Sequence, residues 1–409
     1  GPSPAARDLD VANLVDWFGT GLWFTALAPY LRRRTGMEAG EVALWLGVLG
    51  VAGLAVVVPG SRAAARRGGR PIAVALHLAR AALILPLLVV RSTPVLLVAA
   101  VAVLTLDRTA SGVLQVLVGQ ELDAEDRVRA MSRLHAVANV GIAAGSAVGA
   151  VALQGAGEGR LAVVLAVDAA TFVVAAAVLA AGRRPARATV PATDAGAGPG
   201  APEGRGPAPS VLPRLAPLAV LGAANCVLAL HIPLLNVAMP LLVDDHEALS
   251  LSLVGAAFVL NTLLVVGLQV PLSRGVAGLG AGGRRLRWAA ASLAGGALGL
   301  GVVGAGTGAT AAVVAGAVAV VLVSLAEIWR GVGAWAVSYA VDEASGRDGR
   351  AIGAFALGPA VAGLVGPAVA GPLLLSAGAA GAAALALLVA AAGLAFATRR
   401  PALAPAAGT

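Results

Sequence analysis

The feature that most constrains this chain is a series of twelve continuous apolar stretches. Each is long enough to cross the roughly 30 Å of hydrocarbon in a lipid bilayer. A soluble or disordered chain is excluded, because the mean hydropathy is +0.89 and only 12% of the residues are charged. A membrane β-barrel is disfavoured, because its strands would alternate apolar and polar residues. We therefore predict an all-α integral membrane protein with twelve transmembrane helices, over residues 11–31, 42–59, 71–90, 94–117, 131–154, 161–182, 216–242, 249–270, 287–305, 309–335, 351–375 and 379–398.

The basic residues predict the orientation in the membrane. All 29 are arginines, and with a cytoplasmic N-terminus 21 of them fall in cytoplasmic segments. The few arginines on the other side are Arg32, Arg33, Arg34, Arg91 and Arg160. The positive-inside rule therefore predicts that both termini lie in the cytoplasm. We expect the protein in the cytoplasmic (inner) membrane. The net charge of +8 then reflects membrane-flanking loops, and we expect no nucleic-acid partner.

The chain divides into two similar halves. Residues 183–214 are rich in Pro, Gly, Ala and Arg and contain no apolar run, so we predict a flexible cytoplasmic linker there. It separates an N-terminal six-helix bundle (1–182) from a C-terminal one (215–409). A shift of 221 residues aligns Gly145 with Gly366 and Ser146 with Pro367, and it also aligns Gly112 with Gly333. Such a repeat predicts two bundles related by a pseudo-two-fold axis.

A glycine pattern in the fifth stretch carries a family resemblance. The segment from Gly141 to Ala150 is similar to the antiporter signature GxxxGPxxGG of bacterial drug and natural-product exporters in the major facilitator superfamily, with Ser146 in place of the proline and Ala150 in place of the last glycine. The chain resembles this superfamily over essentially its whole length. The resemblance implies a gating and packing role for Gly141, Gly145, Gly149, Gly366, Pro367 and Gly371. Ordinary close packing of membrane helices explains the same spacing without gating.

Two further patterns resemble the same family. Gly60–Arg70 matches its basic loop between the second and third spans but lacks the acid that normally precedes the arginines. Either the usual charge relay is lost, or another acid supplies it. Arg108 followed by Gly112 matches a pattern of the fourth span.

Ionisable groups inside the spans are the candidates for proton coupling, because burying one in a membrane is costly unless it is paired or hydrated. An acid that alternates between a protonated and an ion-paired state can couple proton movement to alternating access; a static buried ion pair is the other interpretation. We select Asp16, Asp107 and Glu327, with Arg80, Arg108 and Arg330 as charge partners, and interpret Asp168 as structural.

Polar and aromatic side chains inside the spans are candidates to line a substrate cavity, because lipid-facing positions would be apolar. In the first span they recur at helical spacing, which puts them on one face. Bonding between helices is the alternative role. The candidates are Asn13, Trp17, Thr20, Phe24, Asn225, His231, Asn236, Asn261 and Gln269.

The sequence contains no motif for nucleotide or metal chemistry. GxxxxGK[ST], HExxH and CxxC are absent, and Cys226 is the only cysteine. We expect no enzymatic activity, no cofactor and no metal. We predict a monomeric, proton-coupled secondary transporter that exports hydrophobic or amphipathic small molecules, such as antibiotics, drugs or peptide-like natural products. An importer of a small metabolite and a non-transporting membrane sensor or scaffold on the same fold are the alternatives.

Overall fold

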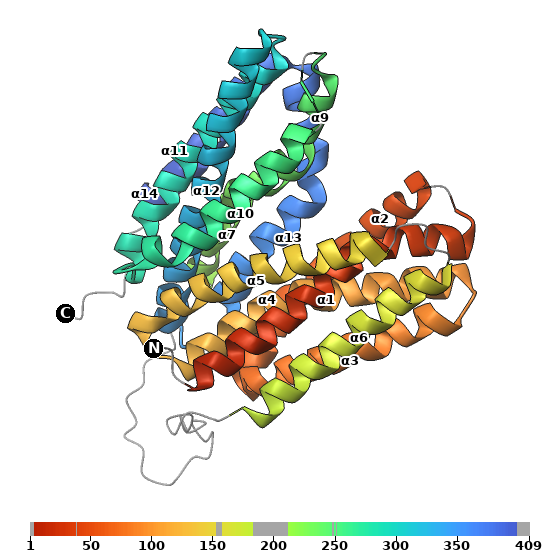
Figure 1. The fold of residues 1–409 in the computed structure, drawn as a ribbon. Coiled ribbons are helices and arrows are strands. Elements are labelled where there is room, and N and C mark those ends of the chain that lie inside the picture. Colours follow the sequence, from red (N-terminus) through yellow and green to blue (C-terminus); the bar gives the residue numbers. More distant parts are fainter. Residues whose placement is uncertain are drawn as a thin grey trace, which may run out of the picture.

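The computed structural model describes residues 4–37, 39–152, 158–182, 212–247, 249–250 and 252–398, and these form a helical protein without strands (Figure 1). The predicted linker therefore falls almost wholly outside the described residues. The first half contains α1 (Pro4–Thr35), α2 (Ala39–Arg67), α3 (Gly69–Val89), α4 (Thr93–Glu121), α5 (Ala124–Ala152) and α6 (Glu158–Ala181).

The second half contains a segmented helix followed by five longer ones. The first rod consists of α7 (Leu212–Leu228), α8 (His231–Pro233), the π-helical turn η1 (Leu234–Ala238) and α9 (Met239–Asp245). The next are α10 (Ser252–Ser273), α11 (Gly278–Gly304), α12 (Ala309–Ala344), α13 (Arg350–Gly371) with the π-helical turn η2 (Pro372–Ser376), and α14 (Gly378–Thr398). Each π-helical turn lies at a proline, which cannot donate the regular helical hydrogen bond, so the ladder is interrupted there.

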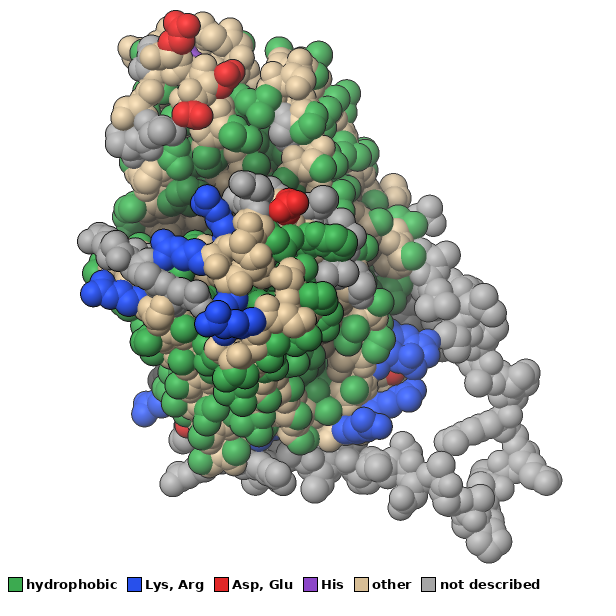
Figure 2. Space-filling model, turned by 90° about the vertical axis from the view of Figure 1, so that its right-hand side faces the viewer, with side chains coloured by type: hydrophobic (Ala, Val, Ile, Leu, Met, Phe, Trp, Pro, Cys, Tyr) green, Lys and Arg blue, Asp and Glu red, His purple; other side chains and the backbone are tan. Residues whose placement is uncertain are grey.

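The described helices thus form twelve rods, as predicted for a membrane protein. Ten of these are long and apolar enough to cross a bilayer. The other two, α1 and α2, have 32 and 29 residues. Large aliphatic side chains cover the outside of the rods, and Val89 and Leu387 are 75% and 72% exposed. Figure 2 shows a broad hydrophobic surface between charged ends. Lipid is the solvent that such a surface requires.

The rods are arranged as two groups that meet at one end. Figure 1 shows the first-half and second-half helices converging where both chain termini lie and diverging away from it. We call the converging end the terminal end and the other the distal end. One buried cluster joins the halves at the terminal end, and its members include Leu9, Val116 and Leu134 from the first half and Val332 and Ile352 from the second. Two further clusters each lie within one half.

Candidate functional site

A buried ionic cluster lies inside the first half, centred on Arg80 of α3. The Arg80 side chain is fully buried, and its Nη2 lies 2.7 Å from Oδ1 of Asp16 on α1 and 3.1 Å from Oδ1 of Asp107 on α4. The guanidinium carbon also lies 3.9 Å from the ring centre of Phe172 on α6, a cation–π distance. One guanidinium therefore holds together four helices, and the two carboxyl groups predicted for proton coupling share it.

Two more ionisable residues belong to this cluster. Nδ1 of His77 lies 3.5 Å from Oδ1 of Asp16. Asp168 on α6 is fully buried, and it interacts electrostatically with Arg80. Neither of its carboxyl oxygens makes a hydrogen bond within the described part of the chain. The cluster consequently contains three carboxyl groups and one guanidinium. Arg108, the partner expected from the sequence, interacts electrostatically with Asp107.

A second polar cluster spans the boundary between the halves. Oε1 of Glu327 on α12 lies 3.0 Å from Nε2 of His135 on α5. The side-chain amide of Asn261 on α10 donates to Oε2 of Glu327 over 3.1 Å and to Oγ of Ser324 over 3.0 Å. The ring of Trp335 packs edge-on against His135. Because His135 comes from the first half and Glu327 from the second, this contact ties the two bundles together.

Arg330 does not take the place expected for it beside Glu327. Although it is buried on the same helix and interacts electrostatically with Glu327, no ion pair within 4.0 Å joins the two in the described structure. His135 supplies the close partner instead.

Further contacts close the terminal end around the second cluster. Arg127 at the start of α5 pairs with Glu343 at the end of α12. Nε2 of Gln115 on α4 donates to Oγ of Ser338 over 2.5 Å, and the hydroxyl of Tyr339 donates to the backbone oxygen of Gln115 over 2.8 Å. All these contacts join the first half to the second.

The terminal end is also closed by backbone packing between α2 and α13. A Cβ on Gly353 would lie 2.9 Å from the Cα of Val58. A Cβ on Gly349 would lie 2.6 Å from the backbone oxygen of Ser61, and Gly349 has a φ of +76° that favours glycine. The contacts of Gln115, Arg127 and His135 with Ser338, Tyr339, Glu343 and Glu327 all join the first half of the chain to the second.

The segment Gly60–Arg70, which the resemblance implied to be a loop, forms the end of α2 and the start of α3, and its Arg70 pairs with an acid on another helix. Arg70 makes a bidentate ion pair with Glu121 at the end of α4, at 2.7 and 2.9 Å, and its Nη1 donates to the backbone oxygen of Leu179 over 2.6 Å. The backbone N–H of Gly69 donates to Gln120. Of the two possibilities left by the sequence, the structure shows the one in which a different acid supplies the pair.

The glycine pattern on α5 forms a close helix crossing within the first half. A Cβ on Gly145 would lie 2.0 Å from the backbone oxygen of Phe18, and a Cβ on Gly141 would lie 2.9 Å from that of Leu14, both on α1. Gly149 approaches Thr25 of α1. In the second half, Gly366 of α13 packs on Pro233 of α8. This contact joins the fifth and first rods of the second half, as Gly145 and Phe18 join the fifth and first rods of the first half. Pro367 is half-buried, and Gly371 is the last residue of α13.

The predicted cavity residues fall into two groups. Those that are buried bond to nearby groups or pack inside a bundle. Asn13 donates to the backbone oxygen of Leu134, Thr20 to that of Asp16, and Asn225 to that of Phe355. The buried set also contains His231, Asn261 and Gln269, while Trp17 is half-buried and Phe24 and Asn236 are exposed.

His135 is not among the candidates selected from the sequence, because it lies near the start of α5 among arginines typical of a loop, and only the fold brings it to Glu327. The structure places Asp168, which we interpret as structural from the sequence, beside Arg80 in the first cluster. Among the described residues, no group of three or more His, Cys, Asp or Glu side chains is placed to hold a metal.

Comparison with solved structures finds the same fold in membrane transporters. The human organic anion transporter MFSD10 (TETRAN) matches with a TM-score of 0.63 and 16% identity, over 97% of this chain and 100% of that one. A bacterial homologue of the iron transporter ferroportin, in an outward-facing state with soaked iron, matches with a TM-score of 0.68 and 14% identity, over 96% and 98%. The proton:xylose symporter XylE matches with a TM-score of 0.66 and 12% identity, over 96% and 94%.

No curated protein sequence matches the chain. The model of the family described as Major Facilitator Superfamily matches residues 9–367, which is most of the chain. The chain therefore belongs to the major facilitator superfamily, a family of transporters rather than enzymes.

Proposed function

We propose that this protein is a proton-coupled secondary transporter that exports hydrophobic or amphipathic small molecules across the cytoplasmic membrane by alternating access. The observation that carries the proposal is the pair of buried carboxyl clusters. One lies around Arg80 inside the first bundle, and the other joins Glu327 to His135 between the bundles. Buried ionisable groups in a membrane protein are costly, so their presence in both places favours a function that uses their charge.

The orientation follows from the arginines. Arg62, Arg66, Arg67 and Arg70 lie where α2 meets α3 at the terminal end, and Arg127, Arg129 and Arg133 lie at the start of α5. By the positive-inside rule this end is cytoplasmic. The side closed by the contacts between the bundles is then the cytoplasmic side.

The Arg80 cluster suits reversible proton binding. Its three carboxyl groups, Asp16, Asp107 and Asp168, lie around the single buried guanidinium of Arg80, so full ionisation would crowd three negative charges into a low-dielectric interior. Bound protons remove that charge. The carboxyl of Asp107 is 27% exposed and that of Asp16 is 13% exposed, so Asp107 offers the more accessible entry for a proton.

Glu327 couples protonation to the contact between the bundles. In its ionised form, its two oxygens accept hydrogen bonds from Asn261 and from a His135 protonated at Nε2. These charge-assisted bonds favour the closed terminal end. When Glu327 takes up a proton, the bond to His135 weakens and the bundles can separate at that end. The proton therefore binds the two states with different affinity, as a population shift requires, because His135 comes from the other bundle.

The expected cargo follows from the sparse polarity of the interior. Few charged side chains lie within the apolar parts of the rods, and Asp16, Asp107 and Glu327 each already have a close partner. A sugar or organic acid would need more uncommitted hydrogen-bonding groups, because a cavity must replace the bonds that a polar cargo makes with water. A lipophilic molecule needs few such groups.

The test is transport in proteoliposomes with the purified full-length chain. A panel of lipophilic antibiotics and dyes is assayed with an imposed pH gradient and again after the gradient has been collapsed with an ionophore. Gradient-dependent movement of a lipophilic compound supports the proposal. Movement of only small polar metabolites favours the importer, and binding without movement favours the sensor or scaffold.

A further inference from the structure

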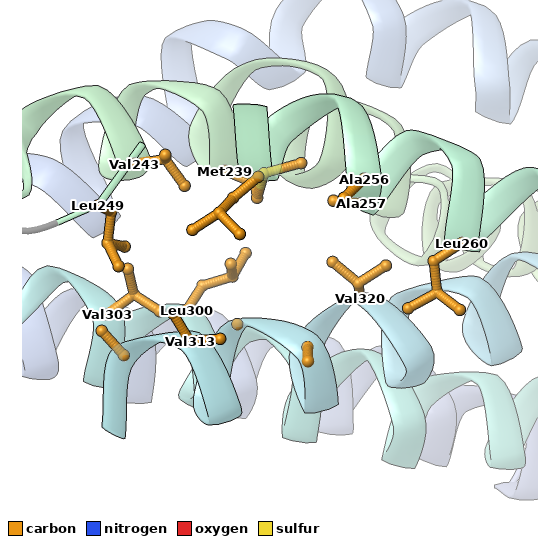
Figure 3. Close-up of a pocket in the computed structure, with 14 residues that line it drawn as sticks. Met239, Val243, Leu249, Ala256, Ala257, Leu260, Leu300, Val303, Val313 and Val320 are labelled. Carbon is orange, nitrogen blue, oxygen red and sulfur yellow. The ribbon is translucent and has the colours of Figure 1, made fainter. Parts of the chain in front are cut away.

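A pocket in the distal half of the second bundle is lined only by aliphatic residues, methionine and glycine. It lies among α9, α10, α11 and α12 and has a volume of about 150 Å³ (Figure 3). Met239 and Val243 line it from α9, Leu260 from α10, and Gly316 and Val320 from α12. No titratable or hydrogen-bonding side chain contributes to the lining. Such a site can make dispersion contacts with a cargo molecule but cannot recognise its polar groups.

Residues that line the pocket and residues of the Glu327 cluster follow one another along one face of α12. Val313, Gly316 and Val320 line the pocket, and Ser324 and Glu327 continue at spacings of three and four residues, so all five share that face. Ser324 donates to the backbone oxygen of Val320. On α10, Leu260 lines the pocket and is followed directly by Asn261, which donates to both Ser324 and Glu327. An apolar pocket and a polar cluster therefore adjoin within about one helical turn, or about 6 Å.

We infer that this pocket holds the aliphatic tail of an amphipathic cargo, whose uncharged hydrogen-bonding end lies at Asn261, Ser324 and Glu327. An uncharged end is favoured because both carboxyl oxygens of Glu327 already have close partners, His135 and Asn261: an added cation would have to displace one of them, and an added anion would face the negative charge of Glu327. An amide or alcohol can instead exchange hydrogen bonds with Asn261 and Ser324. Since lipid is as apolar as the pocket, the polar end supplies the selectivity over lipid tails. This inference rests on the proposed export function for its cargo, but the binding it describes requires no proton gradient.

The tail pocket can be filled by a single substitution. A Cβ on Gly316 would have Val303 Cγ2 as its nearest contact at 3.7 Å, so Gly316→Leu extends into the pocket without a backbone clash. Gly267 on α10 provides the matched control. A Cβ there would meet nothing within 4 Å, and Gly267 does not line the pocket, so Gly267→Leu adds the same side chain elsewhere on the surface.

The experiment is photolabelling of the purified full-length protein in lipid nanodiscs without a proton gradient. The probes are an alkyl amide, an alkylammonium and an alkyl carboxylate with the same diazirine-bearing ten-carbon tail, and a phosphatidylcholine with the same diazirine in its acyl chain. Labelled residues are mapped by mass spectrometry. We expect the amide to label the α10 and α12 lining residues, with at least a tenfold loss in Gly316→Leu and less than a twofold change in Gly267→Leu.

Three results would overturn the inference. The first is labelling of the pocket by the phospholipid that neither Gly316→Leu nor competition by the amide reduces. The second is stronger labelling by either charged probe than by the amide, and the third is no labelling of the pocket by any probe. A separate outcome, in which the amide labels as expected but no compound is moved in proteoliposomes, contradicts the proposed transport function and leaves the binding site standing. The two failures are therefore distinguishable.

Discussion

Nε2 of His135 on α5 lies 3.0 Å from Oε1 of Glu327 on α12, and this contact joins the two bundles across their shared boundary. The residues are separated by 192 positions in the sequence. The Glu327 side chain is 13% exposed and that of His135 is 30% exposed, so the pair is neither sealed in the core nor fully hydrated. We propose that a change of protonation at this pair alters both the hydrogen bond and the packing of the halves.

Removing the histidine should open the terminal end. His135→Leu leaves Glu327 without its partner from the other bundle, so at neutral pH we expect a broader and longer distance distribution across that end. Spin labels on cysteines introduced at Arg66 and Ala344, in a Cys226→Ala background, report that distance by pulsed electron paramagnetic resonance. Both labelled positions are exposed.

The control for this measurement is Arg129→Gln. Arg129 pairs with Asp126 on the same helix, and the two side chains are 53% and 62% exposed, so the loss of this pair should change the distance little. An unchanged distribution in His135→Leu would show that the pair does not hold the bundles together.

Arg80→Met should destabilise the first bundle by about 3–5 kcal/mol, because it leaves Asp16 and Asp107 buried without their shared partner. The measurement is the unfolding midpoint of the purified protein in detergent. Adding Asp16→Asn and Asp107→Asn to Arg80→Met removes the two charges that contact Arg80, leaves that of Asp168, and should recover part of the loss. A triple variant no more stable than Arg80→Met would contradict the electrostatic explanation.

The architecture could be predicted from the sequence because it depends on local pattern. Apolar runs of bilayer length, arginine-rich connections and the repeat around Gly145 and Gly366 are all visible in the chain, and the helices form at those places. Helix boundaries differed by several residues, because amphipathic ends such as Pro4–Asp10 of α1 and Asp342–Ala344 of α12 extend beyond the apolar stretch.

The site could be predicted only in part. The acids Asp16, Asp107 and Glu327 stand out because charge is rare in apolar runs. Their partners do not, because pairing depends on how helices far apart in sequence pack. Spacing favoured Arg330 as the partner of Glu327, since the two lie on one helix face, but the inter-bundle packing brings His135 into contact instead.

Asp168→Asn should preserve the fold and alter the proton count. The asparagine has nearly the same shape, and the buried carboxyl makes no hydrogen bond within the described structure, so we expect the unfolding midpoint to stay equal or rise. If Asp168 carries a proton in the Arg80 cluster, the number of protons moved per cargo molecule should fall. Parallel measurement of cargo flux and proton flux in proteoliposomes gives that ratio, and an unchanged ratio assigns Asp168 to packing alone.

Gly145→Ala should lower stability by about 1–3 kcal/mol, and Gly145→Leu should block cycling. The added Cβ would lie 2.0 Å from the backbone oxygen of Phe18, so α1 and α5 must move apart. Gly363 on α13 is the control, because a Cβ there would meet nothing within 4 Å and Gly363→Ala should be neutral or slightly stabilising. Wild-type unfolding and transport in both Gly145 variants would mean that the close crossing is dispensable.

The most direct test of the account is the pH dependence of the distance across the terminal end, measured with the labels at positions 66 and 344 in the presence and absence of Glu327→Gln. In the otherwise unchanged protein, acidification should shift the population from the short to the long distance as Glu327 takes up a proton. The Glu327→Gln variant mimics the protonated acid and should show the long distance at every pH. A wild-type distance that does not change with pH, or a Glu327→Gln variant that titrates like the wild type, would contradict the central claim that protonation of this buried carboxyl opens the terminal end.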